Sequence, residues 1–184
     1  MDSDSLVLSI AILSFNRPEQ LGLLLQSIDC SPDSVEILIS EDNAPRRSDV
    51  RSVVSRFTEA SPFTVVYHEN AVNLGFDGNL RVALSIAQGQ WVMFMGDDDE
   101  CIPGKLDAYI DFLRGLGDEK YVLRSYRVTH DSGRVEDFRY LPASQRIEAG
   151  EHSVAWLFKR SVTLSGFTIH REEANRHLTD RLDG

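Results

Sequence analysis

The sequence predicts an α/β protein built on a mostly parallel, doubly wound sheet. Two observations carry this prediction. Strand-like and helix-like segments alternate four times between residues 6 and 117, with short connections. The strand-like segments are apolar along nearly their whole length, which indicates strands that are covered on both faces. A chain of 184 residues is long enough to bury one substantial core, so we expect residues 1–184 to form a single domain.

The first half of the alternation contains two strands and two helices. LVLSIAILSF (6–15) is predicted as a strand because it is β-branched and apolar along nearly its whole length. NRPEQLGLLLQSI (16–28) is a helix, since Pro18 suits a first turn and leucines recur at helical spacing. VEILISED (35–42) repeats the strand pattern and ends in acids, and RRSDVRSVVSRFTEA (46–60) carries a helical apolar stripe.

The second half repeats this order. FTVVYHEN (63–70) is the third strand. GFDGNLRVALSIAQG (75–89) is a helix that we expect its C-terminal glycine to stop. QWVMFMGD (90–97) is the fourth strand, and PGKLDAYIDFLRGLG (103–117) is the fourth helix.

After residue 118 the alternation weakens. We expect KYVLRSYRVTHDSGRVEDFRYL (120–141) to form two strands around an Asp-Ser-Gly turn. HSVAWLFKR (152–160) is predicted as a short helix, with Trp156 as a pocket-wall residue. LSGFTIHRE (164–172) is predicted as a further strand that leads into the last helix.

Composition limits the partners and the compartment. The formal net charge of −10 argues against a nucleic-acid or anionic-membrane surface as the main partner. Cys30 and Cys101 have no disulfide framework or metal-ligand spacing around them, which indicates free thiols in a reducing compartment. No apolar run has the length of a membrane-spanning helix, and the first residues lack the basic region of a signal peptide. We therefore expect a cytoplasmic protein with no nucleic-acid partner.

Polar residues gather where the predicted strands end. Asn16 and Arg17 follow the first strand, Asp42 ends the second, and four acids (97–100) follow the fourth. Because the carboxyl ends of parallel strands lie at the same end of a sheet, where such folds bind ligands, we expect these residues to share one ligand site.

The acidic segment has two interpretations. In an extended chain Asp97 and Asp99 point to one side and Asp98 to the other. Paired carboxylates suit Mg²⁺ or Mn²⁺, which takes one or two protein carboxylates together with substrate phosphates. The cluster then forms a seat for a metal and a diphosphate. A solvated turn that caps the following helix explains the same residues equally well.

The other residues at this end also allow two readings each. Asp42 can accept hydrogen bonds from a base or ribose, or it can cap a helix. Arg17 can donate to a phosphate or lie exposed in solvent. The glycines and asparagines of NLGFDGN (73–79) permit close approach of a ligand to the backbone, or they form an ordinary capped loop.

Three stretches taken together resemble the family 2 nucleotide-sugar glycosyltransferases, which have the GT-A fold. They are LSIAILSFNRPEQLGLLLQSI, VEILISEDNAP and NLGFDGNLRVALSIAQGQWVMFMGDDDECIPGKL. The resemblance covers residues 5–117 well, and LSGFTIHRE is a fainter match in the branch that includes abequosyltransferases and related O-antigen enzymes. It implies a nucleotide-sugar-binding half at 5–117 and a partial, shortened acceptor half at 118–184.

The resemblance also implies roles for individual residues. Asp42 matches the aspartate that contacts the nucleotide base. The acidic cluster matches the Asp-x-Asp motif, with Asp99 and Asp97 as the expected metal ligands and Asp98 as an alternative ribose contact. The remaining residues that the resemblance assigns to the donor site are Asn16, Arg17, Asn73, Gly75 and Asn79.

The implied activity is metal-dependent, inverting transfer of a hexosyl or deoxyhexosyl group. The donor is a nucleoside diphosphate sugar, and the metal is Mn²⁺ or Mg²⁺. The acceptor is a polysaccharide or a lipid-linked glycan. A protein that associates peripherally with the inner face of the membrane could reach such an acceptor. Such a reaction needs a general base. No motif places one, and the candidates are Glu172, Glu173 and Asp180. The alternative function is a non-catalytic nucleotide-sugar-binding module that lacks a complete acceptor site.

Overall fold

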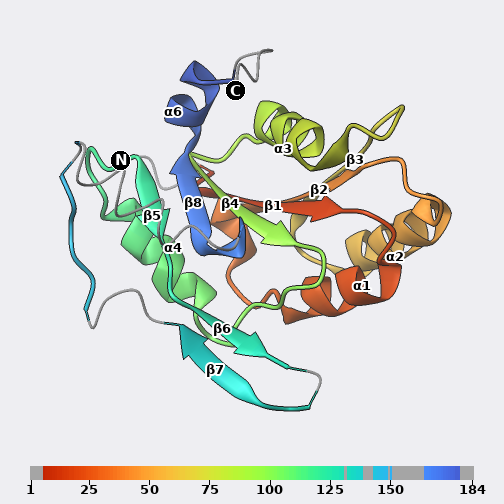
Figure 1. The fold of residues 1–184 in the computed structure, drawn as a ribbon, viewed down its shortest axis with the longest axis horizontal. Helices are drawn as coiled ribbons and strands as arrows, with labels where there is room; N and C mark the ends of the chain where they lie inside the picture. Colours follow the sequence, from red (N-terminus) through yellow and green to blue (C-terminus); the bar gives the residue numbers. More distant parts are fainter. Residues whose placement is uncertain (1–5, 131, 139–142, 149, 151–163, 179–184) are drawn as a thin grey trace.

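The computed structural model describes residues 6–130, 132–138, 143–148, 150 and 164–178 (Figure 1). The predicted helix at 152–160, with Trp156, and the candidate base Asp180 lie outside the described residues. None of the described helices combines the length and apolar character that crossing a membrane requires.

A six-stranded sheet in the order β3-β2-β1-β4-β8-β5 forms the centre of the molecule (Figure 1). Its strands are β1 Leu8–Ser14, β2 Val35–Glu41, β3 Thr64–Glu69, β4 Trp91–Gly96, β5 Tyr121–Leu123 and β8 Phe167–His170. The first four are mutually parallel where they pair, and β8 runs antiparallel to both β4 and β5. The predicted mostly parallel sheet is therefore confirmed.

Helices cover both faces of this sheet. They are α1 Pro18–Ser27, α2 Arg47–Ala60, α3 Gly75–Ile86, α4 Leu106–Arg114 and α6 Arg171–Arg176, with short 3-10 turns η1 Pro32–Ser34 and η2 Leu164–Gly166. Side chains of α1, α2 and α4 join one core, and those of α3 and α6 join the other. Alternate residues of β1 enter the two cores, Ile10 and Ile12 on one face and Ala11 and Leu13 on the other. This explains why the strand is apolar along nearly its whole length.

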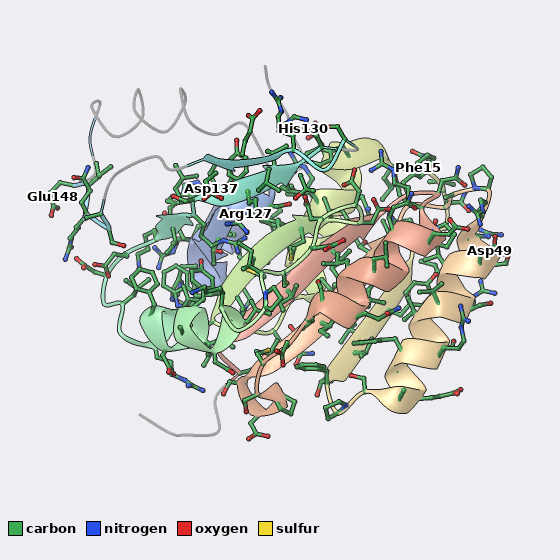
Figure 2. All side chains as sticks on the ribbon, turned by 90° about the horizontal axis from the view of Figure 1, so that it is seen from below. Phe15, Asp49, Arg127, His130, Asp137 and Glu148 are labelled. Atoms are coloured by element: carbon green, nitrogen blue, oxygen red, sulfur yellow. The ribbon has the colours of Figure 1, made fainter. Side chains whose placement is uncertain are left out.

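The segment after residue 118 contributes to two sheets. β6 Tyr126–Thr129 and β7 Val135–Phe138 form the predicted hairpin, with Gly133 at φ +78° in its turn. The hairpin stands apart from the main sheet, and Arg127 and Asp137 form an ion pair across it at 2.8 Å (Figure 2). Residues 121–123 instead join the main sheet as β5, a strand that the sequence pattern did not separate from the hairpin.

The predicted glycine stop of the third helix is wrong. α3 ends at Ile86, and Ala87 is already extended (φ −60°, ψ 137°). Gly89 instead passes directly against β1, where an added Cβ would lie 2.5 Å from the Ser9 nitrogen and 2.7 Å from the Leu8 carbonyl carbon. Its own N–H donates to Ser9 Oγ at 2.8 Å. The glycine is needed for close approach of two backbones.

We predict that Gly89→Ala destabilises the protein by about 1–3 kcal/mol, because the methyl group meets backbone that cannot move aside. Gly22→Ala is the matched control. Its Cβ would lie 3.6 Å from Val53, an ordinary contact, and alanine within helix α1 stabilises by about 0.5–1 kcal/mol. Urea unfolding of the two variants measures both effects, and equal stabilities would contradict the assignment.

Candidate functional site

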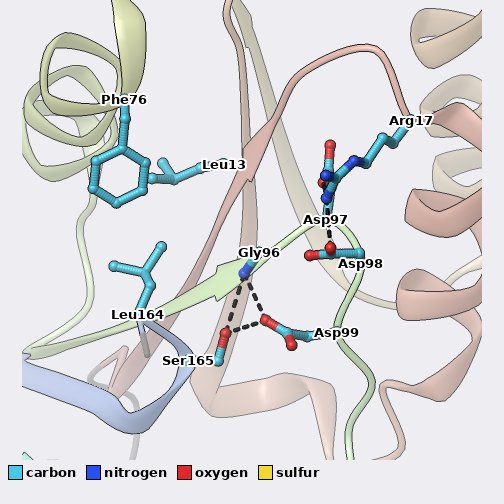
Figure 3. Close-up of a pocket in the computed structure, with 9 residues that line it drawn as sticks. All are labelled: Leu13, Arg17, Phe76, Gly96, Asp97, Asp98, Asp99, Leu164 and Ser165. Carbon is cyan, nitrogen blue, oxygen red and sulfur yellow. Dashed lines mark hydrogen bonds and ion pairs between the residues drawn. The ribbon is translucent and has the colours of Figure 1, made fainter. Parts of the chain in front are cut away.

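The pairing of β1 with β4 creates an open pocket at the carboxyl end of the sheet. Leu13 lies opposite Gly96 in the parallel register, so the chains that leave the two strands are side by side. The pocket, whose lining residues are drawn in Figure 3, has a volume of about 470 Å³. It is lined by Leu13, Arg17, Phe76, Gly96, Asp97, Asp98, Asp99, Leu164 and Ser165.

The acidic segment in this pocket is a turn. The Asp99 N–H donates to the Gly96 carbonyl at 3.2 Å, so the chain reverses directly after β4. The chain is therefore not extended at 97–99, and the alternation that would set Asp97 and Asp99 on one side does not arise. Asp98 and Asp99 fold back over Gly96, whose Cβ, if present, would lie 2.9 Å from Asp98 Oδ1 and 3.0 Å from Asp99 Oδ2. A side chain at residue 96 would displace both carboxylates.

Asp97 faces the chain that leaves β1. It is 4% exposed, and its Oδ2 accepts the Phe15 N–H at 2.8 Å. Arg17 Nη1 lies 3.5 Å from Asp97 Oδ1 and 2.5 Å from Asp98 Oδ2. Burial raises the pKa of Asp97, and the Phe15 N–H and the Arg17 charge oppose that shift. Arg17 therefore supplies the positive charge that lets these acids lie so close together.

Asp99 is held by a residue far along the chain. Its Oδ2 accepts hydrogen bonds from Ser165 Oγ and from the Gly96 N–H, the latter at 3.0 Å. Ser165 belongs to η2, and its backbone carbonyl accepts a hydrogen bond from Arg124 Nη2. The Arg124 guanidinium lies 5.1 Å from the centre of the Tyr109 ring. Burial lowers the pKa of Arg124. Sequence analysis missed Ser165, whose only signal was the faint match at 164–172.

Asp42 anchors the loop between β3 and α3. It is buried, and its Oδ1 accepts hydrogen bonds from Asn70 Nδ2 at 2.9 Å and from the Leu74 N–H at 2.8 Å. It caps no helix, because the residue that precedes α2 is Arg46 and makes no side-chain cap. Asn70, which sequence analysis did not single out, also donates to Asn79 Oδ1 at 3.0 Å.

The remaining predicted donor-site residues lie in the loops after β1 and before α3, and in the first turns of α3. Asn79 is buried and donates to the Ser40 carbonyl at 2.9 Å. Asn73 accepts the Gly75 N–H at 2.9 Å, and Gly75 has φ +72°. Asn16 has φ +65°, and its side chain accepts the Arg46 N–H at 3.2 Å. These residues and Asp42 do not line the pocket, which brings together only Arg17 and Asp97 to Asp99 of the predicted set.

The candidate bases on α6 lie elsewhere. β8 is antiparallel to β4, with His170 opposite Trp91, so α6 begins at the end of the sheet opposite the pocket (Figure 1). Glu172 is exposed, and Glu173 pairs with Arg176 at 3.0 Å and His177 at 3.2 Å. Neither glutamate lines the pocket.

The pocket suits a metal ion that is shared with a ligand. In the described part of the chain no three His, Cys, Asp or Glu side chains are arranged to hold an ion. Mg²⁺ and Mn²⁺ bound with phosphates need only one or two protein carboxylates. Asp98 has a half-exposed side chain, and among the described residues no donor reaches Oδ1 of Asp98 or Asp99. The donor set therefore fits an open oxygen site and not a closed protein cage.

The sequence was also compared with known proteins. The model of the family described as Glycosyl transferase family 2 matches residues 9–177. Abequosyltransferase RfbV of Salmonella typhimurium is 33% identical over 112 residues, which cover 58% of this chain and 33% of that protein. The GalNAc(5)-diNAcBac-PP-undecaprenol beta-1,3-glucosyltransferase of Campylobacter jejuni is 31% identical over 102 residues, covering 55% and 32%. The chain thus matches about a third of the length of these curated relatives.

Solved structures share the fold. TarS 1-349 of S. aureus in complex with UDP has a TM-score of 0.59 and 16% identity, over 92% of this chain and 49% of that one. The mannosyltransferase PcManGT from Pyrobaculum calidifontis, in complex with GDP-Man and Mn²⁺, has a TM-score of 0.56 and 20% identity, over 66% and 36%. These likenesses confirm the GT-A-type fold.

We predict that Ser165→Ala lowers the free energy of unfolding by about 1 kcal/mol, because Asp99 loses a hydrogen bond in a part-buried position. Ser85→Ala is the control. Its exposed hydroxyl donates to the Val82 carbonyl within helix α3, and the effect of the substitution should stay within about 0.5 kcal/mol. Urea unfolding compares the two variants. A Ser165→Ala variant with the same free energy of unfolding as the wild type would show that Ser165 does not hold the turn.

We also predict that the stability of the wild type relative to Asp97→Asn falls as pH rises. Burial raises the pKa of Asp97 in the folded state above its unfolded value, so the folded state binds the proton more tightly. The cost of ionisation is absent below the unfolded pKa and complete above the folded one. Urea unfolding of both proteins in chelator, from about pH 3.5 to 7, measures the difference. If the wild type instead gains stability relative to Asp97→Asn as pH rises, the effect of the Arg17 charge on the pKa of Asp97 outweighs that of burial.

Proposed function

Because the chain belongs to glycosyl transferase family 2, we propose that it is the donor-binding part of a metal-dependent, inverting glycosyltransferase. The donor is a nucleoside diphosphate sugar, and the acceptor is a polysaccharide or a lipid-linked glycan. The observation that carries the proposal is the pocket beyond β1 and β4, which combines one arginine with three aspartates. The Campylobacter relative is named for glucosyl transfer to an undecaprenol-linked glycan, which supports a lipid-linked acceptor. Such an acceptor fits a cytoplasmic protein that works at the inner face of a membrane.

The diphosphate and its metal are assigned to the charged side of this pocket. Asp99 and Asp97 are the carboxylates that we expect to hold Mn²⁺ or Mg²⁺, and Asp98 the one that contacts the nucleotide sugar. Arg17 is the cation among the lining residues, and it can exchange its contacts with Asp97 and Asp98 for a phosphate. When bound, the divalent ion neutralises the charge that develops on the departing diphosphate. The GDP-Man and Mn²⁺ of the mannosyltransferase complex support this assignment.

The nucleoside is assigned to the loops around Asp42. Asp42 Oδ1 receives two protein donors, whereas among the described residues none donates to its Oδ2, which can accept from a base or ribose. The other residues assigned to this part of the site are Asn16, Asn73, Gly75 and Asn79. The UDP in the TarS complex supports nucleotide binding by this fold.

In an inverting transfer the acceptor hydroxyl attacks the anomeric carbon of the sugar. The new glycosidic bond forms as the bond to the diphosphate oxygen breaks, and a base removes the hydroxyl proton. Glu172 and Glu173 lie at the wrong end of the sheet for this role. Because the chain matches about a third of its curated relatives, a second candidate is a module that binds the nucleotide sugar without turnover.

We predict that one of UDP, GDP, CDP and TDP binds in calorimetric titrations that contain Mn²⁺. The same nucleotide should bind at least roughly tenfold more weakly when a chelator removes the metal, since a bridging ion contributes several kcal/mol. Asp99→Asn should abolish the metal-dependent part. Testing Asp97→Asn and Asp98→Asn separately assigns the ligands within the turn. Asp111→Asn on α4 is the control, because that exposed aspartate pairs with Arg114, does not line the pocket and should leave binding unchanged.

Two outcomes oppose the proposal. Failure of all four nucleotides to bind a protein that circular dichroism shows to be folded removes the donor site, and binding that is indifferent to chelator removes the metal. A further assay distinguishes an enzyme from a binding module. An enzyme releases free nucleoside diphosphate from the bound nucleotide sugar when lipid-linked glycans are added, and a binding module does not.

A further inference from the structure

A series of contacts leads from the acidic turn to an arginine behind the pocket. Asp99 Oδ2 accepts a hydrogen bond from Ser165 Oγ. The Gly96 nitrogen lies 3.0 Å from Asp99 Oδ2 and 3.3 Å from Ser165 Oγ (Figure 3). The Ser165 carbonyl in turn accepts a hydrogen bond from Arg124 Nη2. Arg124 does not line the pocket, so it acts on a ligand there either through these contacts or through its charge.

Arg124 fixes the backbone of η2 relative to the sheet. It follows β5 directly, and its own N–H donates to the Gly166 carbonyl at 2.8 Å. Its guanidinium binds the carbonyl of Ser165, one residue earlier. Leu123 and Phe167 pair in the ladder of β5 and β8. Because three consecutive residues, 165–167, are bound to residues 123 and 124, η2 cannot shift without breaking these contacts.

The guanidinium of Arg124 is itself held by α4. It lies 5.1 Å from the centre of the Tyr109 ring, and a cation over an aromatic face is attracted to it. The Tyr109 hydroxyl donates to Thr168 Oγ1 at 2.7 Å, and Thr168 is fully buried in β8. Tyr109 therefore ties the arginine to the strand that follows η2.

Packing does not account for a cation at this position. Arg124 Nε is buried and has no hydrogen-bond partner among the described residues. The contacts of its guanidinium with described residues are a carbonyl oxygen and an aromatic ring. A buried cation without a carboxylate partner loses hydration that it does not regain, and methionine fills a similar space without that cost. What methionine lacks is the hydrogen bond to Ser165.

Resting on the proposed function, we propose that Arg124 is a positioning residue for Asp99 and acts through Ser165. The Ser165 hydroxyl and the Gly96 N–H occupy Oδ2 of Asp99. Among the described residues none donates to Oδ1, which stays available to the divalent ion. A carboxylate that is already held by one oxygen loses less freedom when the other binds a metal. Groups that orient a metal ligand in this way typically contribute about 10–100-fold to metal affinity.

The test measures how much Mn²⁺ the variants need for nucleotide binding. It uses the nucleoside diphosphate that the wild type binds, titrated by calorimetry at a series of Mn²⁺ concentrations. Arg124→Met should raise the Mn²⁺ concentration for half-maximal binding roughly tenfold, and it should leave the weaker binding in chelator within about twofold of the wild type. Ser165→Ala should act in the same direction. The double variant should need no more Mn²⁺ than the more affected single variant, because both changes break one connection.

Two further variants separate position from charge. Arg124→Lys keeps the positive charge and loses the planar fork of donors, so it should recover only part of the wild-type Mn²⁺ affinity. Arg127→Met is the matched control, because it makes the same change at an exposed arginine that pairs with Asp137 and does not line the pocket. It should leave the Mn²⁺ requirement unchanged.

Several results would overturn this inference. A lower Mn²⁺ requirement in Arg124→Met would show that the arginine acts by repelling the ion, and full recovery in Arg124→Lys would show that charge alone suffices. An unchanged requirement, or equal weakening with Mn²⁺ and in chelator, would leave Arg124 a purely structural residue. Additive effects of the two single variants would separate Arg124 from Ser165. A wild type that binds no nucleotide is a different failure, since it removes the proposed function before the variants are compared.

Discussion

The parallel pairing of β1 with β4 is the constraint on which the site depends. It sets Leu13 opposite Gly96, so the chain after one strand meets the chain after the other. As a result Asp97 receives an N–H from Phe15, 82 residues earlier in the sequence, and faces the guanidinium of Arg17. A shift of this register by one residue would turn the apolar side chains of β1 to the wrong faces and separate the two segments. Core packing and site geometry are therefore fixed by the same ladder of hydrogen bonds.

Charge in the pocket is balanced incompletely. One arginine contacts two of the three aspartates, while the third is held by a serine and a backbone N–H. Burial opposes ionisation of Asp97, so ionising this carboxyl group destabilises the folded protein, a cost that a purely structural turn would not need. Such local conflicts are typical of sites where a ligand completes the arrangement. The pocket also leaves an apolar side chain uncovered, because the lining residue Phe76 is 60% exposed.

The sequence predicted the architecture well because the strands carry a strong local signal. Residues on both faces of β1 and β2 are buried, and continuous apolar runs report this directly. The details that depend on distant neighbours were not accessible. Gly89 resembles a helix stop until β1 is placed against it. The direction of the aspartates depends on a turn that Gly96 permits, and the contact of Ser165 with Asp99 spans 66 residues without a local pattern.

The position of β8 in the sheet has a consequence for biosynthesis. β8 comes last of the six strands in the chain and yet lies between β4 and β5. While the ribosome is still making residues 124–166, β8 has not yet been synthesised. During that time β4 has one unpaired edge, and β5 has no strand to pair with in the main sheet. An open strand edge on an apolar nascent chain is a template for pairing with other chains. Chaperone engagement should therefore be greatest in that interval and end when Phe167–His170 emerges and closes the gap.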